Sequence, residues 1–166
     1  MAISKPCIED VKVQKPSPLP ETATEEEIIS HIESIVASIA NAVNERQFDP
    51  NTAPWTSVAS EFSMPAIGFR GEAKSREDYV DGFKNLALPY PNFRIEPLKM
   101  ESYVLLAVGY AEVYLTAQSS GGRTLPMGIK RKGIGRHEFR RVDGAWMNVN
   151  ETSFLGIGDG VAVFEM

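Results

Sequence analysis

The chain has 166 residues, of which 43% are hydrophobic and 23% charged, and its formal net charge is −5. This composition is typical of a single globular domain, and the acidic balance argues against nucleic acid as a partner, since a basic footprint is missing. The only cysteine, Cys7, excludes an intramolecular disulfide, and the two histidines, His31 and His137, lie too far apart in sequence to suggest a zinc motif.

The N-terminal segment, residues 1–21, contains four prolines among charged and small residues. This pattern predicts a flexible arm that precedes a domain spanning residues 22–154, with residues 155–166 as a C-terminal tail. We see no signal peptide and no apolar run approaching the roughly 20 residues of a membrane span. We therefore expect a cytoplasmic protein without a membrane segment.

Two helices have clear start signals. Thr24-Glu25-Glu26-Glu27 forms a capping box for a long amphipathic helix that ends near Gln47, and Ser75-Arg76-Glu77-Asp78 opens a second helix that ends before Pro89. The first helix carries one apolar stripe at helical spacing, made of Ile28, Ile32, Ile35, Ile39 and Val43. We interpret His31, beside this stripe, as a half-buried helix residue.

Shorter elements connect these helices to the last third of the chain. Pro54 suits the first turn of a short helix through Val58, and residues 61–69 read as a strand that Pro65 assigns to an edge or a bulge. Residues 93–100 are predicted to form another strand. Because the helices come early and the strands late, the pattern predicts an α+β fold with helices packed on one face of a curved antiparallel sheet.

The last third, residues 103–154, predicts three long antiparallel strands. Asp143-Gly144 is a strong signal for a two-residue hairpin turn, which would pair Val142 with Ala145. Counting back from this turn predicts one inner sheet face that collects His137, Phe139, Arg141, Trp146, Asn148 and Asn150.

A second turn, at residues 119–122, decides where the preceding strand points. If its loop has an even number of residues, Tyr110, Glu112 and Tyr114 join the inner face, and Glu112 opposes Ile129. An odd loop or a bulge would turn all three outward. The inward interpretation leaves an outer apolar row that a second copy of the chain would cover, and this row comprises Leu105, Ala107, Gly109, Ala111, Val113 and Leu115.

Such an inner face could carry acid–base chemistry. Glu112, desolvated between Tyr110 and Tyr114, would suit a general acid or base, and His137 could transfer a proton near neutral pH. The two tyrosines could also take part in catalysis. Asn148 and Asn150 would donate hydrogen bonds to a substrate oxygen, while apolar walls would come from Phe139, Trp146 and Tyr79.

Structural interpretations compete with these roles. Tyr110 and Tyr114 are common sheet residues, and Glu112 could form an ion pair with Arg131 across the strands. The basic residues at 130–132 and 136 are interpreted as a solvated strand face. Two asparagines that alternate along an inner strand are harder to dismiss, because an unsatisfied buried amide is costly.

The chain resembles the NTF2-like superfamily, in particular its SnoaL-like branch. The resemblance rests on the element order, the helix 24–47, the helix from Ser75, and the closing hairpin Glu138 to Met147 with its Asp-Gly-x-Trp motif. The resemblance covers residues 24 to about 154. It implies a cone-shaped α+β barrel with a pocket between sheet and helices, often dimeric through the sheet. It also implies mostly cofactor-free enzymes, among them polyketide cyclases, dehydratases and fungal meroterpenoid isomerases.

We therefore expect an isomerase or cyclase that needs no cofactor or metal and acts on a small hydrophobic, carbonyl-bearing polyketide or terpenoid intermediate. A dehydratase is a variant of the same enzyme hypothesis. The resemblance disfavours it, because scytalone-dehydratase-like enzymes typically have two histidines in the cone and only His137 is placed there. The alternative is a non-catalytic module that binds a hydrophobic ligand or a protein partner.

Overall fold

In the computed structural model, the described residues are 13–16, 18–66, 71–123 and 128–155. Most of the predicted arm and tail lies outside them. The elements follow the predicted order, and their bounds are α1 (Glu25–Asn44), the 3-10 turn η1 (Trp55–Ser57), β1 (Val58–Ser63), α2 (Arg76–Ala87), β2 (Arg94–Leu105), the 3-10 turn η2 (Leu106–Val108), β3 (Tyr110–Ser120), β4 (Lys130–Val142) and β5 (Ala145–Leu155).

Both predicted helix starts are confirmed. The Thr24 hydroxyl accepts from the Glu27 backbone N–H at 3.2 Å, and the Glu27 carboxylate accepts from the Thr24 N–H at 2.8 Å. Ser75 caps α2 by accepting from the Asp78 N–H at 3.1 Å. The apolar stripe of α1 is buried along its whole length, which fixes this helix against the sheet.

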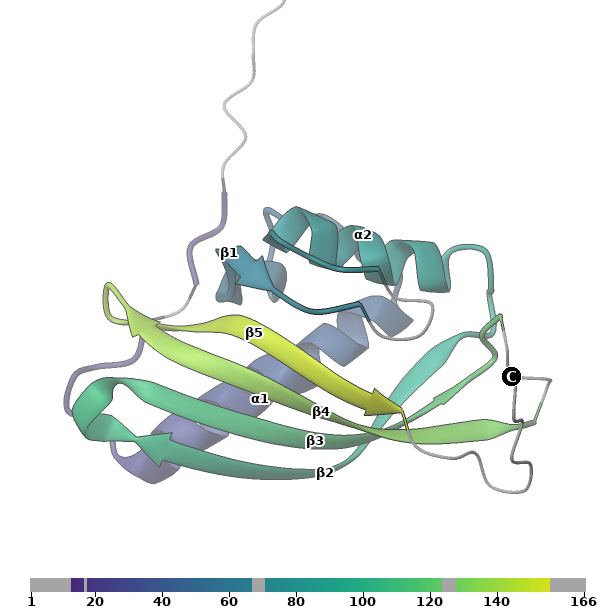
Figure 1. Ribbon diagram of the computed structural model, residues 1–166. Coiled ribbons are helices and arrows are strands. Elements are labelled where there is room, and N and C mark those ends of the chain that lie inside the picture. The colour runs from purple at the N-terminus through teal and green to yellow at the C-terminus, as the bar shows by residue number, and fades with distance from the viewer. Residues whose placement is uncertain (1–12, 17, 67–70, 124–127, 156–166) are drawn as a thin grey trace, which may run out of the picture.

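The sheet has the strand order β1-β5-β4-β3-β2. Strands β2 to β5 are antiparallel, as predicted, and β1 joins the edge in parallel with β5. Figure 1 shows α1 crossing one face of the curved sheet, with β1 and α2 beside one another at the edge next to β5. Within the described residues, no helix combines the length and apolarity needed to cross a membrane.

The closing hairpin has the predicted turn. Asp143 and Gly144 both have positive φ, at 50° and 80°, as a two-residue turn of this type requires. Val142 pairs with Ala145 and Phe139 with Asn148, as expected. Beyond that point β5 contains a bulge, since Phe139 pairs with Asn148 and Glu138 with Asn150, so Val149 has no partner in β4.

The bulge changes which residues share a face. His137 pairs with Glu151 instead of Asn150, so Glu151 enters the inner face and Asn150 leaves it. The predicted inner position of Asn150 is therefore wrong. We call inner face the side of the sheet that bears His137, Phe139 and Asn148, and outer face the opposite side.

The register between β3 and β4 also differs from the prediction. Residues 121–129 connect the two strands, an odd number, and Glu112 pairs with Glu138 instead of Ile129. Odd parity turns Tyr110, Glu112 and Tyr114 to the outer face. Ala111, Val113 and Leu115, predicted to lie outward, are instead buried in the core beneath the helices.

Candidate functional site

A cavity of about 390 Å³ lies between the inner face and the two helices. This volume is within the range of small-molecule sites. Its walls are mainly apolar and come from both helices and from β2 and β3, and they include Val36, Ile39, Phe83, Leu86, Phe93, Ile95 and Leu115. The helices thus form the roof and the sheet forms the floor of one pocket, the arrangement that the sequence predicted.

Polar side chains gather at one place on this floor. His137 on β4 and Glu151 on β5 line the cavity as directly paired neighbours and are only 5% and 4% exposed. Ser153 and Tyr79 line the cavity beside them. A carboxylate and an imidazole buried at the base of an apolar pocket are a common arrangement in acid–base active sites.

Hydrogen bonds hold the Glu151 carboxylate in place. Its Oε2 accepts from the hydroxyl of Tyr79, which is buried on α2, and its Oε1 accepts from the Ser153 hydroxyl at 2.5 Å. Each carboxylate oxygen therefore has a donor, which offsets part of the cost of burying this group. Tyr79 also packs against Phe62 and Phe83, so aromatic contacts fix the position of its hydroxyl.

Asn148 contacts the side of the imidazole that faces away from this cluster. Its fully buried amide lies 3.3 Å from His137 Nδ1 through Nδ2, and its Oδ1 has no hydrogen-bond partner. The two amide orientations are isosteric. With Oδ1 turned toward the ring, Nδ1–H donates to Asn148, and Nε2 becomes a hydrogen-bond acceptor on the pocket side.

Gly135 opens the space next to Nε2. A Cβ at this position would lie 3.3 Å from His137 Nε2, 3.6 Å from Ser153 Oγ and 3.8 Å from Glu151 Oε1. Gly135 itself lines the cavity. The imidazole, the carboxylate and the hydroxyl thus converge beside the Gly135 backbone, where no side chain separates them from a bound molecule.

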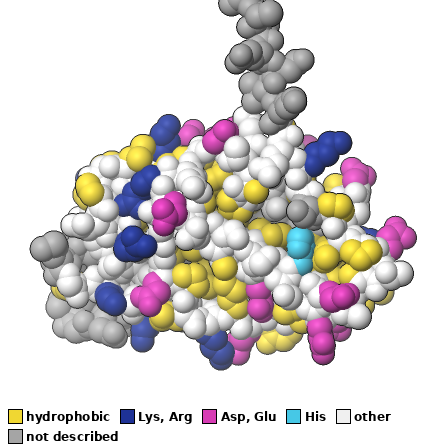
Figure 2. Space-filling model, turned by 180° about the vertical axis from the view of Figure 1, so that it is seen from behind, with side chains coloured by type: hydrophobic (Ala, Val, Ile, Leu, Met, Phe, Trp, Pro, Cys, Tyr) yellow, Lys and Arg dark blue, Asp and Glu magenta, His cyan; other side chains and the backbone are white. Residues whose placement is uncertain are grey.

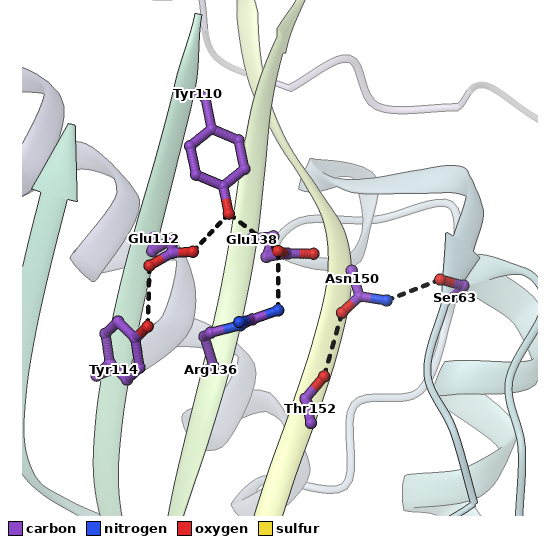
Figure 3. Close-up of polar contacts among 8 residues, drawn as sticks. All are labelled: Ser63, Tyr110, Glu112, Tyr114, Arg136, Glu138, Asn150 and Thr152. Atoms are coloured by element: carbon purple, nitrogen blue, oxygen red, sulfur yellow. Dashed lines mark hydrogen bonds and ion pairs between the residues drawn. The ribbon is translucent and has the colours of Figure 1, made fainter. Parts of the chain in front are cut away.

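The structure places three of the residues predicted to be catalytic elsewhere. Figure 3 shows Tyr110, Glu112 and Tyr114 on the outer face, where the Tyr110 hydroxyl contacts Glu112 at 2.6 Å and Glu138 at 2.9 Å. Tyr114 donates to Glu112 at 2.9 Å. The inner-face prediction for these three residues is wrong, for the reason of loop parity given above. The alternative ion pair of Glu112 with Arg131 is wrong as well, because Arg131 opposes Ser119.

Tyr110 and Tyr114 on the outer face have raised pKa values. Burial raises the pKa of Tyr110, and the hydrogen bonds to Glu112 and Glu138 add to this effect. The pKa of Tyr114 is raised chiefly by its hydrogen bond to Glu112. Arg136 pairs with Glu138 at 2.9 Å. These phenols are held as neutral donors to carboxylates.

The predicted substrate-binding residues divide into three groups. Tyr79 lines the cavity, whereas Phe139, Trp146 and Asn148 are buried and are not among its lining residues. Asn150 is on the outer face, where it donates to Ser63 at 2.8 Å (Figure 3).

The sequence analysis missed Glu151 and Ser153. Their polar character next to Asn150 could have drawn attention, but no residue type at Val149 marks the bulge that turns them inward. No group of three or more His, Cys, Asp and Glu side chains in the described part of the chain is arranged to hold a metal ion. The site is thus built from Tyr79, His137, Glu151 and Ser153, with Asn148 behind them.

No protein-family model and no curated protein sequence matches this chain. Several solved structures do. Hexachlorocyclohexane dehydrochlorinase LinA-type3 from Novosphingobium barchaimii LL02 has 18% identity and a TM-score of 0.62 over 84% of this chain and 93% of its own. An NTF2-like protein of unknown function from Pseudomonas putida KT2440 has 14% identity and a TM-score of 0.63 over 87% and 99%. A candidate scytalone dehydratase from Novosphingobium aromaticivorans DSM 12444 has 12% identity and a TM-score of 0.58 over 82% and 89%.

The fold is NTF2-like. The predicted α+β cone, with a curved sheet and helices on its concave face, is thereby confirmed. At these identities the likeness establishes the fold alone, so activity has to be argued from the site.

Proposed function

We propose that this protein is a cofactor-independent acid–base enzyme that removes a proton from a carbon atom of a small hydrophobic, carbonyl-bearing substrate. One observation supports this most directly. His137 Nε2, Glu151 Oε1 and Ser153 Oγ lie within 4 Å of one point, the position that a Gly135 side chain would fill, on the floor of an apolar cavity.

In this mechanism His137 is the general base. This role requires the Asn148 amide to turn Oδ1, instead of the Nδ2 that lies 3.3 Å from Nδ1, toward the ring, so that Nδ1–H donates to Asn148 and Nε2 is the nitrogen that takes the proton. Once the proton is transferred, the imidazolium lies next to the Glu151 carboxylate, whose negative charge stabilises it in a site with little water. Tyr79 and Ser153 are positioning residues, because they act on the reaction through Glu151.

The fate of the electron pair left on carbon determines the reaction class. It can expel a leaving group from the neighbouring carbon, which is an elimination, or it can delocalise onto the carbonyl and be reprotonated elsewhere, which is an isomerisation. Attack of the same carbanion on a second carbonyl would be a cyclisation. Two of the similar structures bear the names of a dehydrochlorinase and a dehydratase, both of which name eliminations.

These names support elimination as the first reaction to test. The isomerisation or cyclisation of a polyketide or terpenoid intermediate, expected from the SnoaL-like resemblance, begins with the same proton transfer and belongs to the same proposal.

A flat, hydrophobic probe tests the proton transfer without knowledge of the natural substrate. In a nitrobenzisoxazole, loss of the ring C–H proton to a base is coupled to formation of a nitrile and cleavage of the N–O bond, and the released cyanonitrophenolate is coloured. Loss of the general base in His137→Ala should lower kcat/KM about 100-fold, within the usual range for such groups. Glu151→Gln should lower it less, because the base remains.

Two controls accompany this experiment. His31→Ala removes the other histidine, which is half-buried on α1 and does not line the cavity, and should leave the rate unchanged. Circular dichroism should show that all variants are folded. Equal rates in wild type and in folded His137→Ala would contradict the proposal and favour the non-catalytic module that only holds a hydrophobic ligand.

A further inference from the structure

The inner face of β4 has a pattern that extends beyond the acid–base site. Because side chains alternate along a strand, Arg131, Gly133, Gly135 and His137 share one face, and all four line the cavity. Two consecutive inner positions thus lack a side chain. These two positions form a stretch of the cavity floor without side chains, which we call the trough, between the Arg131 guanidinium and the His137 imidazole.

The side chain of Arg131 makes no stabilising polar contact with the described residues. It is half-buried, and among the described residues no hydrogen bond or ion pair engages its guanidinium. Of the described residues that line the cavity, only Glu151 is acidic, and it lies at the opposite end of the trough, bound by Tyr79 and Ser153. A partly desolvated cation beside apolar walls is stabilised when an anion binds to it.

The surroundings of this end of the cavity are also basic. Arg123 lines the cavity as well, and Lys130 and Lys132 flank Arg131 along β4. Figure 2 shows most of the visible Lys and Arg side chains in the left half of that view, which contains the end of the molecule where β4 begins. This field attracts anions although the whole chain has a net charge of −5.

The spacing sets the size of the ligand. Arg131 and His137 are six positions apart along β4, which corresponds to about 20 Å between their Cα atoms at the usual rise per residue. Allowing for the side chains at both ends, the trough has the length of two linked or fused rings. The missing side chains at Gly133 and Gly135 favour a flat molecule.

We propose that the pocket binds elongated, flat hydrophobic carboxylates, with the carboxylate on the Arg131 guanidinium and the opposite end of the molecule at His137. The assignment of the reacting end rests on the function proposed above, whereas the anion site does not depend on it.

A matched pair of probes tests the anion site by binding alone. Para-phenylbenzoate and para-phenylbenzamide have the same shape and differ in charge, and isothermal titration calorimetry gives both dissociation constants. Wild type should bind the carboxylate about tenfold or more tightly than the amide, the effect expected of a charge-assisted hydrogen bond. Arg131→Gln should abolish this preference and leave the affinity for the amide almost unchanged.

Lys132→Gln is the matched control, because it removes the same charge from the neighbouring position, which is exposed on the other face of β4. It should keep the preference for the carboxylate. The proposal is overturned if wild type shows no preference, if Arg131→Gln retains it, if Lys132→Gln loses it equally, or if neither probe binds up to its solubility limit.

The same probes separate this inference from the proposed function. In His137→Ala the preference for the carboxylate should persist while proton transfer is lost. An inactive wild type that still discriminates between the probes through Arg131 would contradict the proposed function alone. An active enzyme without discrimination would contradict the anion site alone.

Discussion

The substitution Gly135→Ala tests the geometry of the site most directly. The added methyl carbon would lie 3.3 Å from His137 Nε2, slightly inside the optimal contact distance of about 3.5–4.0 Å, so the ring has to yield by a few tenths of an ångström. The backbone of Gly135 is not in the left-handed region, so alanine is not strained there. Overpacking costs about 1–3 kcal/mol, and the reduced entropy of the unfolded chain returns about 0.4–1 kcal/mol.

The expected effect on activity is larger than the effect on stability. The methyl group would lie between the Gly135 backbone and the bound molecule, next to Nε2, Glu151 and Ser153, and so displaces the substrate carbon by about 1 Å or more, which costs on the order of 100-fold in rate. At 1.36 kcal/mol per factor of ten, this equals about 2.7 kcal/mol of transition-state stabilisation.

The nitrobenzisoxazole assay and thermal unfolding measure the two effects separately. Gly82→Ala is the control, since it adds a methyl group to another glycine that lines the cavity, where no atom lies within 4 Å of the new Cβ. It should keep the wild-type rate and add slightly to the stability of α2, by roughly 0.5–1 kcal/mol. A folded Gly135→Ala variant as active as wild type would show that the reacting carbon does not bind beside Gly135.

Three further predictions concern other parts of the molecule. Arg46→Met should lower the free energy of unfolding in urea by about 3 kcal/mol, because the guanidinium donates to five backbone carbonyls at the end of α1 and in the loop before β2. An unchanged midpoint of unfolding would refute this. Burial lowers the pKa of His31 below its ordinary value of 6.5, so the unfolded chain binds this proton more tightly than the folded protein does. The free energy of unfolding should therefore fall as the pH drops below that value, and His31→Gln should show a shallower fall. The homodimer through the sheet remains a prediction, and the outer face carries the exposed side chains of Tyr103 and Leu105, which are 60% and 59% exposed. Tyr103→Glu should sediment as a monomer, whereas a wild type that is itself monomeric at all concentrations would refute the dimer.

Local signals in the sequence predicted most of the fold. Capping residues at Thr24 and Ser75 define helix starts through contacts within one turn, and Asp143-Gly144 defines a hairpin through its own backbone angles. Such features depend on residues that are close in sequence, so they can be recognised without knowledge of the tertiary structure. The element order and the pocket between sheet and helices followed from them.

Two non-local features could not be recognised in this way. The number of residues between β3 and β4 depends on where pairing stops, and the Ser-Ser-Gly-Gly run suggested a tight turn where residues 121–129 form the connection. This decided the fate of Glu112. The bulge at Val149 depends on how β5 fits between β1 and β4, and no residue type announces it. This decided that Glu151, and not Asn150, accompanies His137.

Because of the bulge at Val149, neighbouring residues of β5 have different roles. Before it, Asn148 contacts His137 Nδ1; after it, Glu151 lines the cavity, while Asn150 donates to Ser63 at the end of the edge strand β1. If Val149 instead paired with Glu138, simple alternation would place Asn150 opposite His137 and exchange the carboxylate at the base of the pocket for an amide. The register of this strand therefore decides the chemistry of the site as much as its residue types do, and a homologue could change the group opposite the imidazole by losing the bulge without any substitution at the site.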